Sequence, residues 1–151
     1  FDVTYDKRTV NFGRFVARST ASYTKFRGFT RTSNPAQNAG RDGFPRWRAQ
    51  GSVAWNYKAH NAVVGLNYIP SYGDYVRDGF EVAPYYTVNT SYGYDFPAGV
   101  FTWLDNTRVS IGADNLLGKQ PPLHNSSVGY DQSFIGRPQG RFFFIAIRKT
   151  L

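Results

Sequence analysis

Side chains that perform chemistry are few in this chain, and they lie far apart. The two histidines are His60, in a short turn, and His124, in a loop, and the chain contains no cysteine. No ligand set for zinc and no Ser-His-Asp arrangement can be recognised from these residues. Ser126 and Ser127 lie near His124, but two serines in a loop are most simply turn residues. We predict a protein that is not an enzyme and that binds neither a metal nor a cofactor.

The composition excludes two broad classes of protein. The chain has 151 residues, of which 41% are hydrophobic and 18% aromatic, too many for a disordered chain. Its longest apolar run is residues 142–147, far short of the roughly 20 residues that a membrane-spanning helix needs. The net charge of +8 suits nucleic acid, anionic lipid or an acidic partner. Because the chain starts without Met or a signal peptide, we expect that it begins inside a longer sequence or after processing.

The elements that position the remaining polar side chains are predicted to be β-strands. Apolar residues recur with period two, as in residues 46–57, where Trp47, Val53 and Trp55 alternate with Arg48 and Asn56. Similar alternation predicts six long strands, in residues 13–29, 46–57, 61–72, 82–96, 107–114 and 141–151, with residues 1–5 as the stump of a seventh. We predict an all-β, antiparallel up-and-down meander.

The connections between these segments alternate in length. Residues 58–60 form a tight turn, whereas residues 30–43, 71–79 and 123–136 form long loops on the opposite side. The connection at residues 97–106 is the exception, because it is longer than the other turns on its side. Short turns on one side and long loops on the other are typical of transmembrane β-barrels.

Aromatic residues at both ends of the strands favour a membrane over a soluble sandwich. From Trp47 to Tyr57 there are ten residue steps, which at about 3.3 Å each and a tilt near 40° rise roughly 25 Å, the height of a lipid-facing band. Tyr86 and Phe96 repeat this spacing. A soluble sandwich with aromatic strands is the alternative, but soluble strands usually have five or six residues.

Three motifs occur in a fixed order in the last third of the chain: Asn115-Leu116-Leu117-Gly118-Lys119-Gln120-Pro121-Pro122, Gly129-Tyr130-Asp131, and Gly136-Arg137-Pro138-Gln139-Gly140-Arg141. They resemble the carboxyl end of TonB-dependent outer-membrane transporters. In that family the penultimate strand ends in a v-x-N-L-F-d-K-x-P-P stretch, and G-Y-D and G-R lead into the last strand. The chain departs from this pattern at Leu117, where the family usually has Phe, and at Leu151, where it has an aromatic residue.

The resemblance implies a 22-stranded barrel that encloses an amino-terminal plug and is driven by the TonB complex. Residues 1–151 would be the carboxyl-terminal segment of that barrel, without the plug and the earlier strands. The implied function is uptake across the bacterial outer membrane of a scarce ligand such as a siderophore-iron complex. Cobalamin, a sugar or a peptide are equally open as ligands. The alternative is a small closed outer-membrane barrel with a structural or adhesive role.

On the barrel interpretation each strand has one face toward the lumen and one toward lipid. The predicted lumen-facing residues are Arg14, Arg18, Arg46, Arg48, Asn56, Asn61, Asn67, Asn89, Arg108, Asp114 and Arg148. The predicted lipid-facing residues are Trp47, Val53, Trp55, Leu66, Val88, Ile111, Phe143, Ile145, Ile147 and Leu151. The lumen-facing set either forms a hydrated wall or pairs with acidic groups on the plug or on a ligand. Nucleic acid is not expected, because the arginines and the tryptophans lie on opposite faces.

The last strand, residues 140–151, is expected to close the barrel against the first. Its apolar face carries one polar side chain, Lys149, whose ammonium group is expected to reach the membrane interface. An apolar alternating end of this kind resembles the signal that the barrel-assembly machinery reads.

Overall fold

The computed structural model describes residues 1–25, 27–28, 36–37, 45–74, 80–99, 103–124, 129–130 and 140–150. In these residues the fold is all-β, without a helix. The seven long strands are β1 (Asp2–Thr9), β2 (Gly13–Tyr23), β5 (Trp47–Tyr57), β6 (His60–Ile69), β9 (Tyr85–Phe96), β10 (Thr107–Asp114) and β11 (Phe142–Lys149). Two small sheets pair β3 (Arg27–Gly28) with β4 (Ala36–Gln37) and β7 (Tyr72–Gly73) with β8 (Glu81–Val82).

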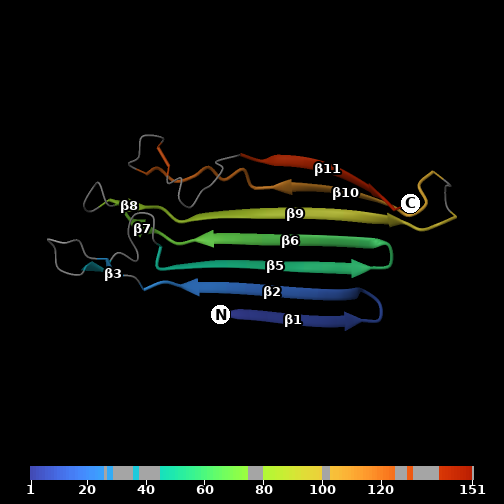
Figure 1. The fold of residues 1–151 in the computed structure, drawn as a ribbon, viewed down its shortest axis with the longest axis horizontal. Coiled ribbons are helices and arrows are strands. Elements are labelled where there is room, and N and C mark those ends of the chain that lie inside the picture. The colour runs from blue at the N-terminus through green and yellow to red at the C-terminus, as the bar shows by residue number, and fades with distance from the viewer. Residues whose placement is uncertain are drawn as a thin grey trace.

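The seven long strands form one antiparallel sheet in the order β1-β2-β5-β6-β9-β10-β11, so each strand pairs with the next long strand of the chain (Figure 1). The predicted antiparallel meander is therefore confirmed. The short turns between β1 and β2 and between β5 and β6 lie at one end of the sheet, where β9 also ends and β10 begins, and we call it the short-turn end. The strands β3, β7 and β8 lie beyond the opposite end, which we call the long-loop end (Figure 1).

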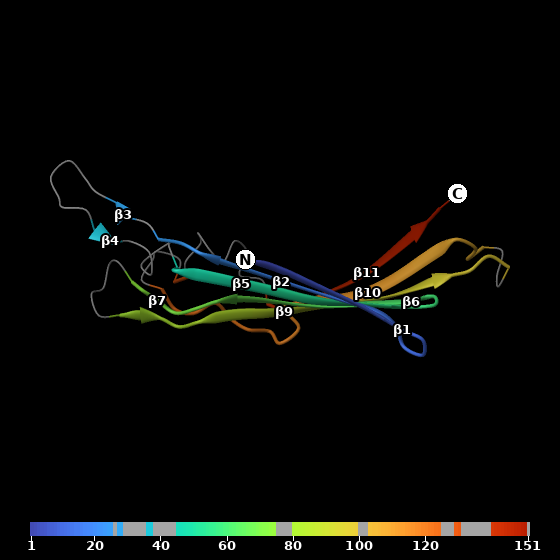
Figure 2. The same ribbon diagram turned by 90° about the horizontal axis from the view of Figure 1, so that it is seen from below.

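The sheet is a single layer. Seen along its edge it is twisted, and no second layer of described residues covers either face (Figure 2). The buried hydrophobic residues of the described chain are only Tyr72, Val82 and Ala113. β1 and β11 are the two edges of the sheet. No helix among the described residues is long and apolar enough to cross a membrane.

Two prolines set the limits of the central strands. β6 ends at Ile69, before Pro70, and β9 begins at Tyr85, after Pro84, and these two end residues pair with each other. Proline has no N–H group to donate to a sheet ladder, so both strands stop there. We predicted longer strands that included Tyr72 and Val82. That prediction was wrong, because these residues pair with each other in the small β7-β8 sheet.

Three further limits differ from the sequence prediction. The strand predicted in residues 13–29 ends at Tyr23, because Arg27–Gly28 pairs with Ala36–Gln37 in a separate small sheet. The expected stump at residues 1–5 is a full strand that continues to Thr9, because the ladder with β2 extends to the pair Thr9 and Gly13. His60 is the first residue of β6 and pairs with Tyr57, so the turn consists of Lys58 and Ala59 only.

Candidate functional site

The strand register separates the predicted site residues into two groups. Directly paired residues in a sheet lie on the same face, and successive residues lie on opposite faces. The polar face carries Arg14, Arg18, Arg48, Asn56, Asn61, Asn67, Asn89, Arg108, Asp114 and Arg148. The apolar face carries Trp47, Val53, Trp55, Leu66, Val88, Ile111, Phe143, Ile145 and Ile147.

Two residues of the prediction lie outside this division. Arg46 directly precedes β5, and its carbonyl oxygen accepts a hydrogen bond from the backbone N–H of Thr24 at 2.7 Å. Leu151 lies outside the described residues, as do most of the three predicted long loops. The register places the two groups on opposite faces, but the solvent that each face meets remains a prediction.

A network of three side chains lies on the polar face near the short-turn end. Arg108 donates to Asp95 twice, from Nε to Oδ1 at 2.5 Å and from Nη2 to Oδ2 at 2.7 Å. Asn61 donates from Nδ2 to the same carboxylate at 3.3 Å. A Cβ atom at Gly93 would lie 2.5 Å from Asn61 Oδ1, so the glycine leaves the space that the amide occupies. The arrangement fixes one guanidinium and one amide on a single carboxylate.

A second ion pair lies on the polar face at the edge of the sheet. Arg14 on β2 donates from Nε to both carboxylate oxygens of Asp6 on β1, at 3.0 Å each, and its Nη2 also contacts Asp6. Farther along the same two strands, Thr20 donates to Asp2 at 2.6 Å. These bonds tie β1 to β2 in addition to the ladder, which helps to hold an edge strand in register.

Cations without an acidic partner remain on the polar face. Arg148 lies directly opposite Arg108, whose guanidinium forms an ion pair with Asp95. Neither Arg148 nor Arg18 forms an ion pair with another described residue. Arg18 lines a hollow of about 340 Å³ whose polar walls include Gln50, Ser52 and Asn67. This face therefore offers hydrogen-bond donors and positive charge to an anionic or hydroxyl-rich partner.

The apolar face is bordered at the long-loop end by a row of aromatic side chains. Tyr23 pairs with Trp47, and Tyr68 pairs with Tyr86. The rings of Trp47 and Tyr68 join these pairs, with their centroids 5.3 Å apart. The Lys119 Nζ atom lies 5.5 Å from the centroid of the Tyr86 ring.

A second aromatic row borders the apolar face at the short-turn end. It is centred on His60, whose ring centroid lies 5.0 Å from that of Tyr94 and 6.4 Å from that of Trp55. The His60 Nδ1 atom and the Tyr92 hydroxyl are 2.6 Å apart and share a hydrogen bond. The Trp55 indole donates to the Phe12 carbonyl oxygen at 2.7 Å. The Trp55 indole N–H, His60 Nδ1 and the Tyr92 hydroxyl therefore have hydrogen-bond partners at this border.

Aliphatic side chains fill the band between the two aromatic rows, and they are exposed. The exposed fraction is 46% for Leu66, 53% for Ile111 and 74% for Ile145. A contiguous apolar surface of this kind on a protein marks contact with lipid or with another protein.

Charge on the apolar face has one sign. The acidic residues of the seven strands are Asp2, Asp6, Asp95 and Asp114, and all of them lie on the polar face. Lys7 and Lys149 lie on the apolar face, both toward the short-turn end. The Lys149 ammonium donates to the Trp103 carbonyl oxygen at 2.8 Å, in the connection between β9 and β10.

Sequence reasoning did not identify the role of Asn115. Its side chain donates to the Lys119 carbonyl oxygen and accepts from the Lys119 N–H, both at 2.9 Å. Its own N–H donates to Asn89 Oδ1 at 2.9 Å, so Asn89 supports the end of β10 as well as lining the polar face. Asn115 has a φ angle of 48°, a conformation that asparagine adopts more readily than most residues. This angle is visible in the structure and not in the sequence.

The two histidines lie in different parts of the described structure. His60 lies in the aromatic row, and His124 is 6% exposed in the connection between β10 and β11. In the described part of the chain no three His, Cys, Asp or Glu side chains form a group that could hold a metal ion.

No family model, curated protein or solved structure matches the chain. The family resemblance of the last third therefore remains a prediction, and the structural support for a function comes from the two faces.

Proposed function

We propose that this chain forms seven consecutive strands of a larger transmembrane β-barrel in a bacterial outer membrane. The apolar face contacts lipid and the polar face lines the lumen. The observation that carries the proposal is the exposed aliphatic band, which is free of acidic residues and bordered by an aromatic row at each end. Rings with a polar atom are suited to the two membrane interfaces, and aliphatic side chains are suited to the hydrocarbon between them.

The dimensions of the sheet support this proposal. Ten residue steps separate Trp47 from Tyr57 in β5, a rise of roughly 25 Å at the usual tilt. In hydrocarbon every backbone N–H and C=O needs a partner within the protein, and the ladder between successive strands supplies it. Within the seven-stranded sheet of the described residues, only β1 and β11 have a free edge.

The two free edges favour a large barrel over a small closed one. A row of unpaired backbone donors in hydrocarbon costs several kcal/mol per group, so β1 and β11 each need a further strand beside them. The described strands form an open sheet in which β1 and β11 lie at opposite edges. Additional strands of the same protein are the partners that we propose.

The specific function that we propose is TonB-dependent uptake of a scarce ligand such as a siderophore-iron complex. The proposal rests on the three motifs of the last third, which resemble this family of transporters. The two hydrogen bonds from the Asn115 side chain to the backbone N–H and C=O of Lys119 give a physical reason for the asparagine of the first motif. On this proposal a plug domain of the same protein faces the cationic polar face, and the TonB complex supplies the energy.

Uptake by intact cells tests this function. Cells with and without the full-length protein are incubated with labelled ferric siderophores, cobalamin and oligosaccharides, before and after an uncoupler collapses the proton-motive force. We expect accumulation of one ligand class that needs both the protein and the proton-motive force. Passage that depends on the protein but not on the proton-motive force would contradict TonB-dependent uptake and would favour a passive pore. No protein-dependent uptake in cells that carry the folded protein would favour a structural or adhesive role.

A further inference from the structure

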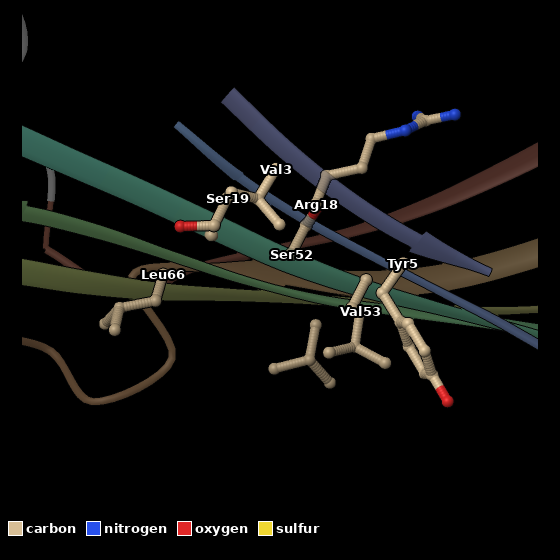
Figure 3. Close-up of a pocket in the computed structure, with 10 residues that line it drawn as sticks. Val3, Tyr5, Arg18, Ser19, Ser52, Val53 and Leu66 are labelled. Atoms are coloured by element: carbon tan, nitrogen blue, oxygen red, sulfur yellow. The ribbon is translucent and has the colours of Figure 1, made fainter. Parts of the chain in front are cut away.

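A groove lies in the apolar face along β2. It has a volume of about 360 Å³ and extends over β1, β2, β5 and β6. Its lining includes the small residues Ala17, Ser19 and Gly51, which we call its floor. Tyr5, Val53 and Leu66 project from the same side of the sheet, whereas Arg18 points away from them (Figure 3).

The register places the floor of the groove inside the aliphatic band. Ser19, Gly51 and Leu66 lie side by side in one row, with Val88 at its far end. The next row toward the short-turn end contains Tyr5, Ala17, Val53 and Val64. The groove therefore lies at the depth of acyl chains if the apolar face contacts lipid.

A positive charge marks the end of the groove that is nearer to the membrane interface. Lys7 follows Tyr5 by two residues on the same face of β1, about 7 Å farther along the strand. Lys7 lies in the same row as Phe15, Trp55 and Tyr92. This row belongs to the aromatic border of the band. Every carboxylate of the seven strands is on the opposite face. A lipid phosphate near Lys7 would therefore meet a cation and no competing anion.

We propose that this groove binds one anionic phospholipid, with its phosphate at Lys7 and an acyl chain along Ala17, Ser19 and Gly51. The inference rests on the proposed membrane location and adds a specific lipid site to it. Two contributions favour binding of the lipid: the burial of its acyl-chain methylene groups against the walls of the groove, and the attraction between its phosphate and Lys7. The occupant is phospholipid and not a second copy of the chain, because the exposed surface of the groove is apolar and a cation without a competing carboxylate lies just beyond one end of it.

Gly51 allows the groove to be filled without strain. A Cβ atom there would lie 3.7 Å from the Arg18 carbonyl oxygen, an ordinary contact distance. Gly65 is a matched control, because it also lies in the middle of a central strand but on the polar face, and its Cβ would lie 3.9 Å from the nearest atom. Gly51→Leu and Gly65→Leu thus add the same group to opposite faces.

Native mass spectrometry of the full-length protein tests the site, with phosphatidylglycerol and phosphatidylcholine added in turn. We expect the unmodified protein to retain one phosphatidylglycerol in preference to phosphatidylcholine. Lys7→Gln should lower phosphatidylglycerol retention about fivefold without changing phosphatidylcholine retention. Gly51→Leu should lower retention of both lipids about tenfold, as expected if roughly two methylene groups lose their contacts. Gly65→Leu should behave as the unmodified protein.

Three results would overturn the lipid site. The first is equal retention in all four proteins, and the second is an equal loss in Gly51→Leu and Gly65→Leu. The third is a dimer that Gly51→Leu dissociates, which would make the groove a contact between two copies. Flotation with lipid vesicles, measured on the same samples, separates this inference from the proposed function. Protein that floats but lacks lipid preference contradicts the groove alone, whereas protein that does not float contradicts the membrane location.

Discussion

Arg108 and Asp95 lie directly opposite each other on β10 and β9, and two parallel hydrogen bonds of 2.5 and 2.7 Å join them. Both side chains are nearly half exposed, so water weakens their attraction. We expect a coupling free energy of about 0.5–1 kcal/mol between them in a double-mutant cycle of Asp95→Asn and Arg108→Gln. Urea unfolding of the folded protein in lipid vesicles measures it.

Asp114→Asn is the control for this cycle, because Asp114 lies on the same face without an ion-pair partner among the described residues. Its combination with Arg108→Gln should be additive. Additive effects of Asp95→Asn and Arg108→Gln themselves would show that the pair does not contribute to stability.

Two glycines of the polar face should differ in their response to alanine. At Gly112 a Cβ atom would lie 2.7 Å from the Thr90 carbonyl oxygen and would also clash with Phe144 Cζ. Because backbone has to move there, we expect Gly112→Ala to lower the free energy of unfolding by about 1–3 kcal/mol. At Gly93 the clashing atoms are the ends of the Asn61 and Ser110 side chains, so Gly93→Ala should cost less.

The same unfolding measurement checks both glycine variants. In the Asn61→Ala background the cost of Gly93→Ala should decrease, because the amide that clashes is gone, whereas the cost of Gly112→Ala should stay the same. The reverse ranking of the two glycines would contradict the contacts described for Asn61 and Phe144.

The last strand offers neighbouring positions for a charge on either face. Ile145 is on the apolar face and 74% exposed, and Ala146 pairs with Ser110 on the polar face. Ile145→Asp places a carboxylate in the lipid band, and we expect it to cost up to about 3 kcal/mol and to lower the yield of inserted protein. Ala146→Asp should insert normally. Heat-modifiable gel mobility of outer-membrane fractions measures the yield, and equal yields would contradict the orientation of β11.

The end of the chain is expected to be needed for insertion. Deletion of residues 147–151 removes the apolar end of β11 and its pairing with Val109 and Thr107, so we expect no folded barrel in the outer membrane. Leu151→Phe should insert as well as the unmodified protein or better. A normal yield of the truncated protein would show that this strand does not close the barrel.

The two faces could be predicted from the sequence because a strand has a local period of two. Arg48 and Trp47 must lie on opposite faces of any strand that contains both. The same argument predicts opposite faces for Ile145 and Arg148, and the register shows them there. It failed at Tyr72 and Val82, because periodicity alone does not show that Pro70 and Pro84 interrupt the ladder before these residues.

The contacts between strands could not be predicted, because they depend on register. Asn61, Asp95 and Arg108 come from three strands, and a shift of one residue in either pairing would separate them. The length of β1 could not be predicted either, because Lys7 follows Val3 and Tyr5 on the same face and interrupts the apolar alternation. The groove along β2 likewise depends on which small residues become neighbours.

Leu66 and Asn67 test the central claim most directly, because they are adjacent in β6 and lie on opposite faces. The chain has no cysteine, so a spin label on Leu66→Cys or Asn67→Cys is unique within it. Electron paramagnetic resonance of the full-length protein in lipid vesicles then compares relaxation by oxygen, which concentrates in lipid, with relaxation by a water-soluble nickel chelate. We predict that oxygen dominates at position 66 and the nickel chelate at position 67. The nickel chelate dominating at position 66, or equal relaxation by both reagents at the two positions, would contradict a lipid-facing apolar surface.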